Sequence, residues 1–370
     1  MEKKKLGFGF MRLPLIDTND SSSIDQELTN KMVDEFIKKG FNYFDTAYVY
    51  HNGMSENAFR NAVVNRYPRD VYTITDKMPI WLISETTDFQ KYFNEQLERC
   101  GVEYFDYYWL HALRKESYEK IEKFGGFDFL KKMKAEGRVS HIGFSFHDNA
   151  EVLDRIMSDH SEIDYVQLQI NYFDWNSTIV ESRKCHEVAK KHGKPIIVME
   201  PVKGGILANV LPDVEKLFKE YHPDMSIASW AIRYAASLDN VMLVLSGMSN
   251  LEQMKDNLSF MYDFQPLDKT EKEIIDKTLS VMSDVAIQCT SCRYCAEECP
   301  KNIAIPECFS IYNQIKQFEK TRYKNKVKFT ELIKTHGKPS DCINCKNCEE
   351  RCPQKINISD WMKIIADEIE

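Results

Sequence analysis

The chain has 370 residues, a formal net charge of −8 and 43% hydrophobic residues. This length and hydrophobic content suffice for one large domain and a smaller second one, and the negative charge argues against a general nucleic-acid-binding protein. No apolar run reaches the roughly 18 residues that a membrane span needs. The first residues, Met1–Leu6, show no signal-peptide pattern, and the many free thiols suit a reducing compartment, so we expect a cytoplasmic protein without a membrane or nucleic-acid partner.

Short apolar runs alternate with amphipathic segments as far as about residue 262. The predicted strands are Leu6–Met11, Asn42–Thr46, Val71–Asp76, Phe105–Leu110, His141–Phe146, Tyr165–Ile170, Pro195–Met199 and Val241–Ser246. The helix-like segments include Gln26–Lys39, Glu56–Arg66, Phe89–Cys100, Phe127–Glu136, Ala150–Ser158, Val180–His192, Ile227–Ser237 and Leu251–Ser259, and glycines at 40, 101, 137 and 193 favour helix ends. Eight such units predict an α/β fold, a (β/α)8 TIM barrel over residues 1–262. The absence of a G-x-G-x-x-G motif after the first strand argues against a Rossmann domain.

Residues 263–287 are predicted to form a helical connector with Thr270–Met282 at its centre, and residues 288–370 a small cysteine-rich domain. Two copies of the run C-x2-C-x2-C-x3-C-P stand in this domain, ending in Pro300 and Pro353. This run ligates [4Fe–4S] clusters, and in two-cluster proteins the fourth cysteine of each run ligates the other cluster. We therefore expect one cluster on Cys289, Cys292, Cys295 and Cys352, and another on Cys342, Cys345, Cys348 and Cys299.

Zinc ribbons or a disulfide framework are the alternatives for these cysteines, but zinc sites usually have two separate C-x2-C pairs. The two runs are separated by 42 residues, from Pro300 to Asp341, which include a lysine-rich helical stretch over Ile311–Lys334. A long helical spacer resembles the α-helical type of ferredoxin domain. Beyond the duplicated cysteine run, we expect no internal repeat.

Function in a TIM barrel is expected at the carboxyl ends of the strands and in the loops after them. Four polar residues meet this condition: Asp45 at the end of the second strand, Tyr50 in the following loop, Lys77 at the end of the third strand and His111 at the end of the fourth. A lone lysine or histidine at such a place is more often a solvated or structural group. Four of them at three successive strand ends indicate a reaction centre.

These residues carry a family resemblance. The pattern Asp45-Thr46-Ala47-x-x-Tyr50, the Ser55-Glu56 pair, Lys77 and His111 resemble the aldo/keto reductase family, as do Ile142–Ser145, Gln167 and the segment from Ser246 to Asn257. With the cysteine domain, the whole chain resembles the iron–sulfur-containing branch of that family. The resemblance implies a nicotinamide cofactor, NADP or NAD, and places it at Gly9, Met11, Ser145, Gln167, Met199, Ser246, Gly247, Met248, Gln253 and Asn257.

The resemblance also implies roles in reducing a small-molecule carbonyl substrate. Tyr50 is expected to supply the proton, and a free phenol has a pKa near 10, which is high for an acid working at neutral pH. We expect the Lys77 ammonium to lower the pKa of Tyr50, Asp45 to hold Lys77, and His111 to donate a hydrogen bond to the substrate oxygen.

Several positions depart from the family pattern. Phe146 and His147 follow Ser145 where an asparagine is usual, Met199 replaces the stacking aromatic residue, and Gln253, with Lys255 nearby, stands where a basic residue usually binds the 2′-phosphate of NADP. The cofactor is therefore left as NADP or NAD, with a flavin as a further occupant.

Three functions remain open. The chain is a carbonyl reductase with an added cluster domain, an electron-transfer enzyme that couples the clusters to a flavin or to a redox carrier protein, or a reductase whose clusters are structural or sensory. Trp81 and Trp109 are expected to line the substrate pocket or to pack in the core. Cys100 and Cys185 are expected to pack, Cys308 is not expected to be a ligand, and the lysines of Lys316–Lys334 are expected to be solvated or to dock an acidic carrier.

Overall fold

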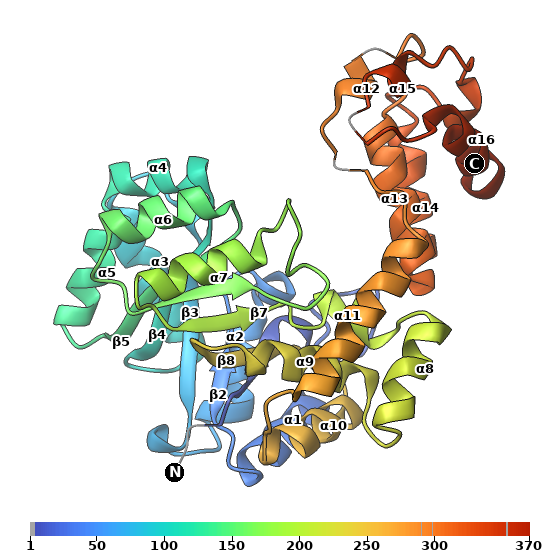
Figure 1. Ribbon diagram of the computed structural model, residues 1–370. Helices are drawn as coiled ribbons and strands as arrows, with labels where there is room; N and C mark the ends of the chain where they lie inside the picture. The colour runs from blue at the N-terminus through green and yellow to red at the C-terminus, as the bar shows by residue number, and fades with distance from the viewer. Residues whose placement is uncertain (1–3, 290, 298, 353) are drawn as a thin grey trace. The chain divides into compact units, whose positions relative to one another are not determined.

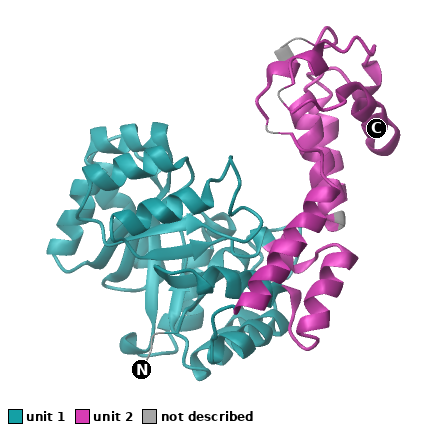
Figure 2. Ribbon diagram, in the orientation of Figure 1, with its two compact units in different colours: residues 1–204, 228–267 teal, residues 205–227, 268–370 magenta. Residues whose placement is uncertain are grey.

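The computed structural model describes residues 4–370 except 290, 298 and 353, so Pro353 and residues 1–3 of the expected N-terminal segment lie outside the described residues. The chain divides into two compact units. The first comprises Met1–Gly204 and Ala228–Leu267, and the second comprises Gly205–Ile227 and Asp268–Glu370 (Figure 2). Searched along its described residues, the chain has no helix that combines the length and the apolar character of a membrane span. The predicted boundaries at residues 262 and 287 stay predictions.

A closed barrel of eight parallel strands forms the centre of the first unit, with neighbours in chain order from β1 to β8 (Figure 1). The predicted (β/α)8 architecture is thereby confirmed. The strands are β1 (Leu6–Gly9), β2 (Tyr43–Asp45), β3 (Thr73–Met78), β4 (Phe105–Leu113), β5 (Val139–Phe146), β6 (Tyr165–Gln169), β7 (Ile196–Met199) and β8 (Val241–Ser246).

Helices of the first unit lie outside this barrel (Figure 1). They are α1 (Gln26–Lys38), α2 (Ser55–Phe59), α3 (Thr87–Cys100), α4 (Lys115–Phe124), α5 (Gly126–Ala135), α6 (Ala150–Asp159), α7 (Ser182–Lys191), α9 (Ile227–Ser237) and α10 (Leu251–Tyr262). The four predicted glycine stops all have positive φ, between 65° and 77°, as a left-handed helix end requires. Helix α4 was not among the predicted segments, and the predicted helix Glu56–Arg66 is α2 followed by a π-turn over Arg60–Val64.

Aromatic and aliphatic side chains fill the barrel, as they do in this architecture. The interior cluster contains Tyr43, Tyr107, Trp109, Ile197, Leu243 and Leu245. Trp109 is fully buried, which makes it a core residue and not a lining of the substrate pocket. It packs against Gly143 of β5, where a Cβ atom would lie 2.5 Å from the indole ring and 2.1 Å from the Tyr165 carbonyl oxygen. Only glycine leaves room for this packing.

The second unit begins with α8 (Pro212–Tyr221) and α11 (Lys269–Asp284). Helix α11 starts at a capping box, in which Asp268 accepts from the Glu271 N–H and Glu271 accepts from the Asp268 N–H. His222, just after α8, contacts the Glu271 carboxylate at 2.9 Å. This helix contains the predicted connector core Thr270–Met282, whereas α8 was not predicted.

The cysteine-rich region contains α12 (Tyr294–Glu297), α13 (Ile305–Gln317), α14 (Arg322–Leu332), α15 (Asn347–Glu350) and α16 (Ile358–Ile369). The predicted helical stretch Ile311–Lys334 is mostly helical but interrupted, because α13 ends at Gln317 and a 3-10 turn over Glu319–Thr321 precedes α14. The Thr321 hydroxyl donates to the Phe318 and Gln314 carbonyls, and this bonding satisfies the helix end that the turn leaves open.

The duplication extends well beyond the cysteine run. An offset of 53 residues, the interval from Cys289 to Cys342, also relates α12 to α15 and the start of α13 to the start of α16. The same offset relates three pairs of residues with positive φ: Ser291 to Asn344, Arg293 to Lys346 and Asn302 to Lys355. The repeated backbone features therefore extend beyond the cysteine run, which the sequence did not indicate.

Candidate active site and cysteine cavities

Lys77 lies at the centre of the predicted reaction centre. Its ammonium donates to Asp45 Oδ1 at 2.6 Å, to the Thr46 carbonyl at 2.7 Å and to the Tyr50 hydroxyl at 3.2 Å. Parallel pairing of β2 with β3 brings Asp45 and Lys77 to the same end of the barrel. The structure thus brings together the residues that the sequence placed at separate strand ends.

Tyr50 is held by an unusual turn. The two residues after it, His51 and Asn52, both have positive φ, 53° and 54°. The His51 imidazole accepts from the Leu13 N–H at 3.1 Å and contacts the Ser21 carbonyl at 2.8 Å, so it joins this turn to the loop after β1. Sequence reasoning missed His51, because its contacts join segments that are far apart in the chain.

Burial and charge act in opposite directions on Lys77. Burial lowers the pKa of Lys77. The Asp45 carboxylate and Tyr50 together raise it by more than burial lowers it, so the pKa ends above its usual value. Burial raises the pKa of Asp45, while Lys77 lowers it. We take the pair as ionised, because the three ammonium donors each have an acceptor and a neutral amine would leave one acceptor without a proton.

Lys77 lowers the pKa of Tyr50, as expected, but burial raises this pKa by a larger amount. Burial raises the pKa of Tyr50, the Lys77 ammonium lowers it by a smaller amount, and the Asp45 carboxylate raises it again. The expectation of a lowered pKa was therefore wrong in its net direction. The phenol stays protonated at neutral pH and keeps a proton to donate.

His111 lies at an irregularity of β4. The register with β5 shifts between Leu110 and Leu113, and Ala112 has a φ of +57° and donates its N–H to the Ser145 hydroxyl at 2.7 Å. Such a bulge changes the direction of a side chain at a strand end. The imidazole of His111 lies 5.9 Å from the Tyr50 ring and 5.2 Å from Trp81, measured between ring centroids.

The imidazole of His111 is neutral. Burial lowers its pKa far below the usual value, and the Lys77 charge lowers it further. Its Nδ1 is buried and has no hydrogen-bond partner among the described residues. Since buried donors are rarely left unpaired, we assign the proton to Nε2, which can then donate to a substrate oxygen.

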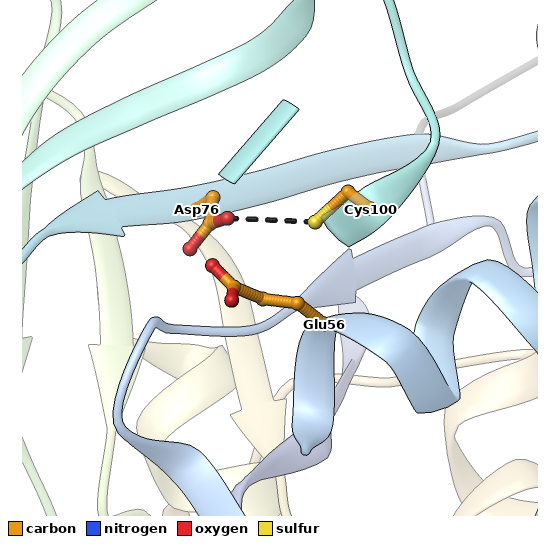
Figure 3. A group of neighbouring side chains, drawn as sticks. All are labelled: Glu56, Asp76 and Cys100. Atoms are coloured by element: carbon orange, nitrogen blue, oxygen red, sulfur yellow. Dashed lines mark hydrogen bonds between the residues drawn. The ribbon is translucent and has the colours of Figure 1, made fainter. Parts of the chain in front are cut away.

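A buried pair of carboxyl groups lies behind Lys77, on the helix side of β3. Figure 3 shows Glu56 and Asp76 facing each other, with the Cys100 thiol donating to Asp76 at 3.5 Å. Asp76 Oδ1 accepts from the Lys77 N–H at 2.7 Å, and Gln96 donates to the Lys77 carbonyl at 3.0 Å. Burial, and next the Glu56 charge, raise the pKa of Asp76 well above its usual value. We infer that the pair shares a proton.

Sequence reasoning read Glu56 only as part of a motif and did not single out Asp76. The available signal was an acidic residue within a predicted strand, directly before Lys77. The expectation that Cys100 is a packing residue agrees with its complete burial, although its thiol also donates to this pair.

The residues predicted to bind the cofactor lie at the ends of several strands. Gln167 donates to Asp45 Oδ2 at 3.4 Å, and Asn257 of α10 donates to the Ser246 hydroxyl at 2.7 Å. A Cβ atom on Gly9 would lie 3.6 Å from the Ser246 carbonyl oxygen, so β1 approaches the loop after β8 closely. Met11 and Gly247 are exposed, Met199 is half-buried and Met248 is buried.

Gln253 has a structural role. Its side-chain oxygen accepts from the Ser249 N–H at 2.8 Å, so it shapes the loop after β8. Lys255, two residues further along α10, is exposed. A nicotinamide dinucleotide fits this arrangement: β1 approaches the loop after β8 closely at Gly9, Gly247 in that loop is exposed, and the amides of Gln167 and Asn257 are buried.

Two cavities in the second unit divide the eight run cysteines into the sets predicted from the sequence. One cavity, of about 310 Å³, is lined by Cys289, Cys292, Cys295 and Cys352. The other, of about 360 Å³, is lined by Cys299, Cys342, Cys345 and Cys348. The remaining lining is mostly apolar and includes Ile358 in both cases. Four thiols around each space are a donor set that fits an iron–sulfur cluster.

Backbone groups also point at the sulfur atoms. The Ser291 N–H donates to Cys289 Sγ at 3.4 Å, and the Ile303 N–H donates to Cys299 Sγ at 3.5 Å. Burial raises the pKa of Cys295 to about 12 and that of Cys348 to about 11, so iron binding must release these protons. Cys308 is buried in the apolar core, and neither cavity has it in its lining.

Comparison with known proteins identifies both parts of the chain. The model of the aldo/keto reductase family matches residues 5–280, and the model of the 4Fe-4S dicluster domain matches residues 288–356. An oxidoreductase of Bacillus subtilis, YqkF, is 23% identical over 70% of this chain and 90% of its own length. The L-galactose dehydrogenase of Arabidopsis thaliana is 23% identical over 68% of this chain and 83% of its own.

Solved structures show the same fold. The holo form of aldo-keto reductase AKR11C1 from Bacillus halodurans has a TM-score of 0.58 at 24% identity, over 74% of this chain and 91% of that one. An aldo-keto reductase from Klebsiella pneumoniae in complex with NADPH has a TM-score of 0.57 at 18% identity, over 74% of this chain and 90% of that one. The resemblance stated from the sequence is confirmed.

Proposed function

Because the chain belongs to the aldo/keto reductase family, and is thus an oxidoreductase that also has a 4Fe-4S dicluster domain, we propose that it reduces a small carbonyl compound with NADPH or NADH. The observation that carries the proposal is the position of the Lys77 ammonium, which contacts both Asp45 and the Tyr50 hydroxyl at the carboxyl ends of the strands. A protonated phenol held beside a fixed positive charge is suited to give up its proton as negative charge develops on a bound oxygen.

A nicotinamide held by the residues at these strand ends would supply the hydride for the carbonyl carbon. Tyr50 donates its proton to the carbonyl oxygen, and Lys77 stabilises the phenolate that remains. Asp45 keeps the ammonium charged and in place. The neutral His111 donates from Nε2 to the same oxygen and so orients the substrate, and solvent later returns the proton to Tyr50.

The cofactor is proposed to lie across the strand ends from Gln167 to Ser246. We propose that Ser145 and Gln167 bind its carboxamide and that the loop from Gly247 to Gln253 covers the dinucleotide. Lys255 offers a positive charge for a 2′-phosphate, which favours NADP. The Klebsiella relative that was solved with NADPH supports this choice.

The dicluster domain is proposed to carry two [4Fe–4S] clusters in the two cysteine cavities, and such clusters exchange single electrons. We keep residues 288–370 as its boundaries. Thiol-ligated clusters suit a reducing compartment, so we propose a cytoplasmic protein. A redox carrier protein is the partner expected if the clusters conduct electrons.

The dicluster match favours a second candidate, in which the clusters pass electrons to the barrel through a flavin or another two-electron carrier. An anaerobic titration of the cluster-loaded protein with NADPH, and then with NADH, separates the candidates. We expect both nicotinamides to leave the clusters oxidised by EPR while an aldehyde is still reduced. Cluster reduction in step with nicotinamide oxidation, or flavin released on denaturation, would instead support the second candidate.

A further inference from the structure

The backbone N–H and carbonyl groups of Lys77 lie beyond the last pairing of β2 with β3. The register of these two strands ends at the pair Asp45 and Thr75, and the Thr46 N–H donates to the Thr75 carbonyl at 3.0 Å. Backbone groups of residues two apart in a strand point to the same side. The N–H and carbonyl of Lys77 therefore point past the end of β2, where buried backbone groups need partners other than a strand.

Two buried side chains supply these partners. Asp76 Oδ1 accepts from the Lys77 N–H at 2.7 Å, and the Gln96 amide of α3 donates to the Lys77 carbonyl at 3.0 Å. The side chains of Asp76 and Gln96 are both fully buried. Successive side chains of a strand face opposite sides, so Asp76 lies on the helix side of β3 while the Lys77 ammonium lies inside the barrel. The backbone of Lys77 is thus held from outside the barrel.

Further buried contacts hold these two partners in place. The Gln96 side-chain oxygen accepts from the Tyr108 hydroxyl at 2.5 Å. Burial raises the pKa of Glu56, while hydrogen bonds with Asp76 and Gln96 lower it, and Figure 3 shows the carboxyl groups of Glu56 and Asp76 facing each other. The contacts thus run from the Lys77 N–H through the carboxyl pair and Gln96 back to the Lys77 carbonyl. They form a closed ring around the backbone of one residue.

The Lys77 ammonium, at the other end of the same residue, has contacts of different lengths. It lies 2.6 Å from Asp45 Oδ1, 2.7 Å from the Thr46 carbonyl and 3.2 Å from the Tyr50 hydroxyl. The contact with Tyr50 is the longest of the three, so a small shift of the Lys77 backbone weakens it first. A misplacement of about 1 Å near a reaction centre can lower a rate about a hundredfold.

We propose that Gln96 and Asp76 are positioning residues of the reaction centre: they fix the backbone of Lys77 so that its ammonium stays beside the Tyr50 hydroxyl. Both residues act through Lys77, from the helix side of β3. This inference rests on the proposed function, because it adds to the residues on which the same site depends.

A measurement without turnover tests this role. Gln96→Met removes the amide at similar side-chain length, and Gln90→Met is the matched control, because Gln90 of the same helix donates to Asn94 on the exposed side. With 3-fluorotyrosine in place of Tyr50, fluorine NMR follows the ionisation of this one phenol. Burial raises the pKa of Tyr50 and the Lys77 ammonium lowers it, so a displaced ammonium should raise the measured pKa, by about half a unit or more. We expect this shift in Gln96→Met and none in Gln90→Met.

Kinetics of the holoenzyme provide the second readout. We expect Gln96→Met to lower kcat about tenfold while the Kd for NADPH stays within about twofold, and Gln90→Met to change neither. Tyr108→Phe removes the hydroxyl that holds the Gln96 oxygen. It should raise the fluorotyrosine pKa in the same direction by a smaller amount, and it decides the question if Gln96→Met does not fold.

The two readouts separate this inference from the proposed function. An unchanged fluorotyrosine pKa in folded Gln96→Met would overturn the inference whatever happens to kcat, because a smaller fraction of folded enzyme lowers a rate without moving a pKa. The same holds for an unchanged pKa in Tyr108→Phe if that variant has to decide. A raised pKa in a protein whose parent reduces no aldehyde would contradict the proposed function and leave the positioning role standing.

Discussion

In the proposed reaction, the Tyr50 hydroxyl donates the proton to the carbonyl oxygen. Tyr50→Phe removes the hydroxyl that Lys77 contacts at 3.2 Å and leaves the strand ends intact. We expect reduction to fall at least ~10³-fold, because general acid catalysis contributes factors of about 10²–10⁴, while the Kd for NADPH stays within twofold. Tyr48→Phe is the matched control: its hydroxyl contacts Glu95 and Arg99 on the outer side. Unchanged turnover in Tyr50→Phe would remove this residue from the mechanism.

The raised pKa of Tyr50 fixes the pH dependence of reduction. The protonated phenol is the active form, and burial raises its pKa above the usual value of about 10. The rate should therefore be level through neutral pH and fall only in the alkaline range, as the phenol ionises. In Lys77→Met the pKa of Tyr50 should rise further, since the ammonium that lowers it is gone. A kcat profile that falls between pH 6 and 8 would contradict this account.

The carboxyl pair behind Lys77 affects stability. The folded-state pKa of Asp76 is raised well above its unfolded value by burial and the Glu56 charge, so the folded protein holds a proton that the unfolded chain releases. Stability should then decline as pH rises from the unfolded pKa towards the folded one, by at most ~1.4 kcal/mol per pH unit.

Asp76→Asn tests this argument. The carboxamide can still accept from the Lys77 N–H and can donate to the Glu56 carboxylate in place of the shared proton. We expect the variant to lose less stability than the parent between pH 6 and 9, measured by urea unfolding at matched cluster content. Parallel pH dependences of parent and variant would show that Asp76 is already ionised in the folded state.

The repeated halves of the cysteine domain differ in charge at matched positions. The cavity of Cys342, Cys345, Cys348 and Cys299 is also lined by Lys301 and Lys346. Their counterparts, 53 residues away, are Gln354 and Arg293, and Arg293 forms an ion pair with Glu307. The two lysines form no ion pair among the residues described. Net positive charge favours the reduced cluster, so the cluster next to the lysines should have the higher reduction potential.

Lys346→Gln should lower the higher of the two potentials and leave the lower one unchanged. Arg293→Gln is the matched variant and should have a smaller effect, because Glu307 already offsets its charge. EPR-monitored redox titration gives both potentials in each variant. Equal shifts of both potentials in Lys346→Gln would show that the charge acts through solvent on both clusters alike.

Periodicity and spacing predicted the barrel, the strand-end residues and the cysteine sets. Both are local patterns in the sequence. Eight strand-and-helix units form a closed barrel, and the carboxyl ends of its parallel strands lie at the same end of that barrel. The bulge at Ala112, the contacts of His51 and the pairing of Glu56 with Asp76 could not be predicted, because they depend on side chains from distant segments. Helix α8 was also not predicted, although Pro212 at its start was an available signal.

The division of the whole chain also differs from a simple order of domains. Residues 205–227, inside the stretch predicted as barrel, belong to the second compact unit. His222 explains part of this, since it contacts Glu271 of α11 at 2.9 Å. A segment inserted between β7 and α9 thus packs on the connector helix. The family match over residues 5–280 agrees with a barrel sequence that continues into this helix.

The central claim is that the barrel transfers a hydride directly, without passing electrons through the clusters. The most direct measurement is anaerobic turnover of an aldehyde by the cluster-loaded protein with NADPH deuterated at both C4 positions, in protiated water. The account predicts one deuterium on the carbinol carbon of every alcohol formed, which mass spectrometry detects. An alcohol carrying only protium at that carbon would show that electrons and solvent protons arrive separately, and would contradict the account.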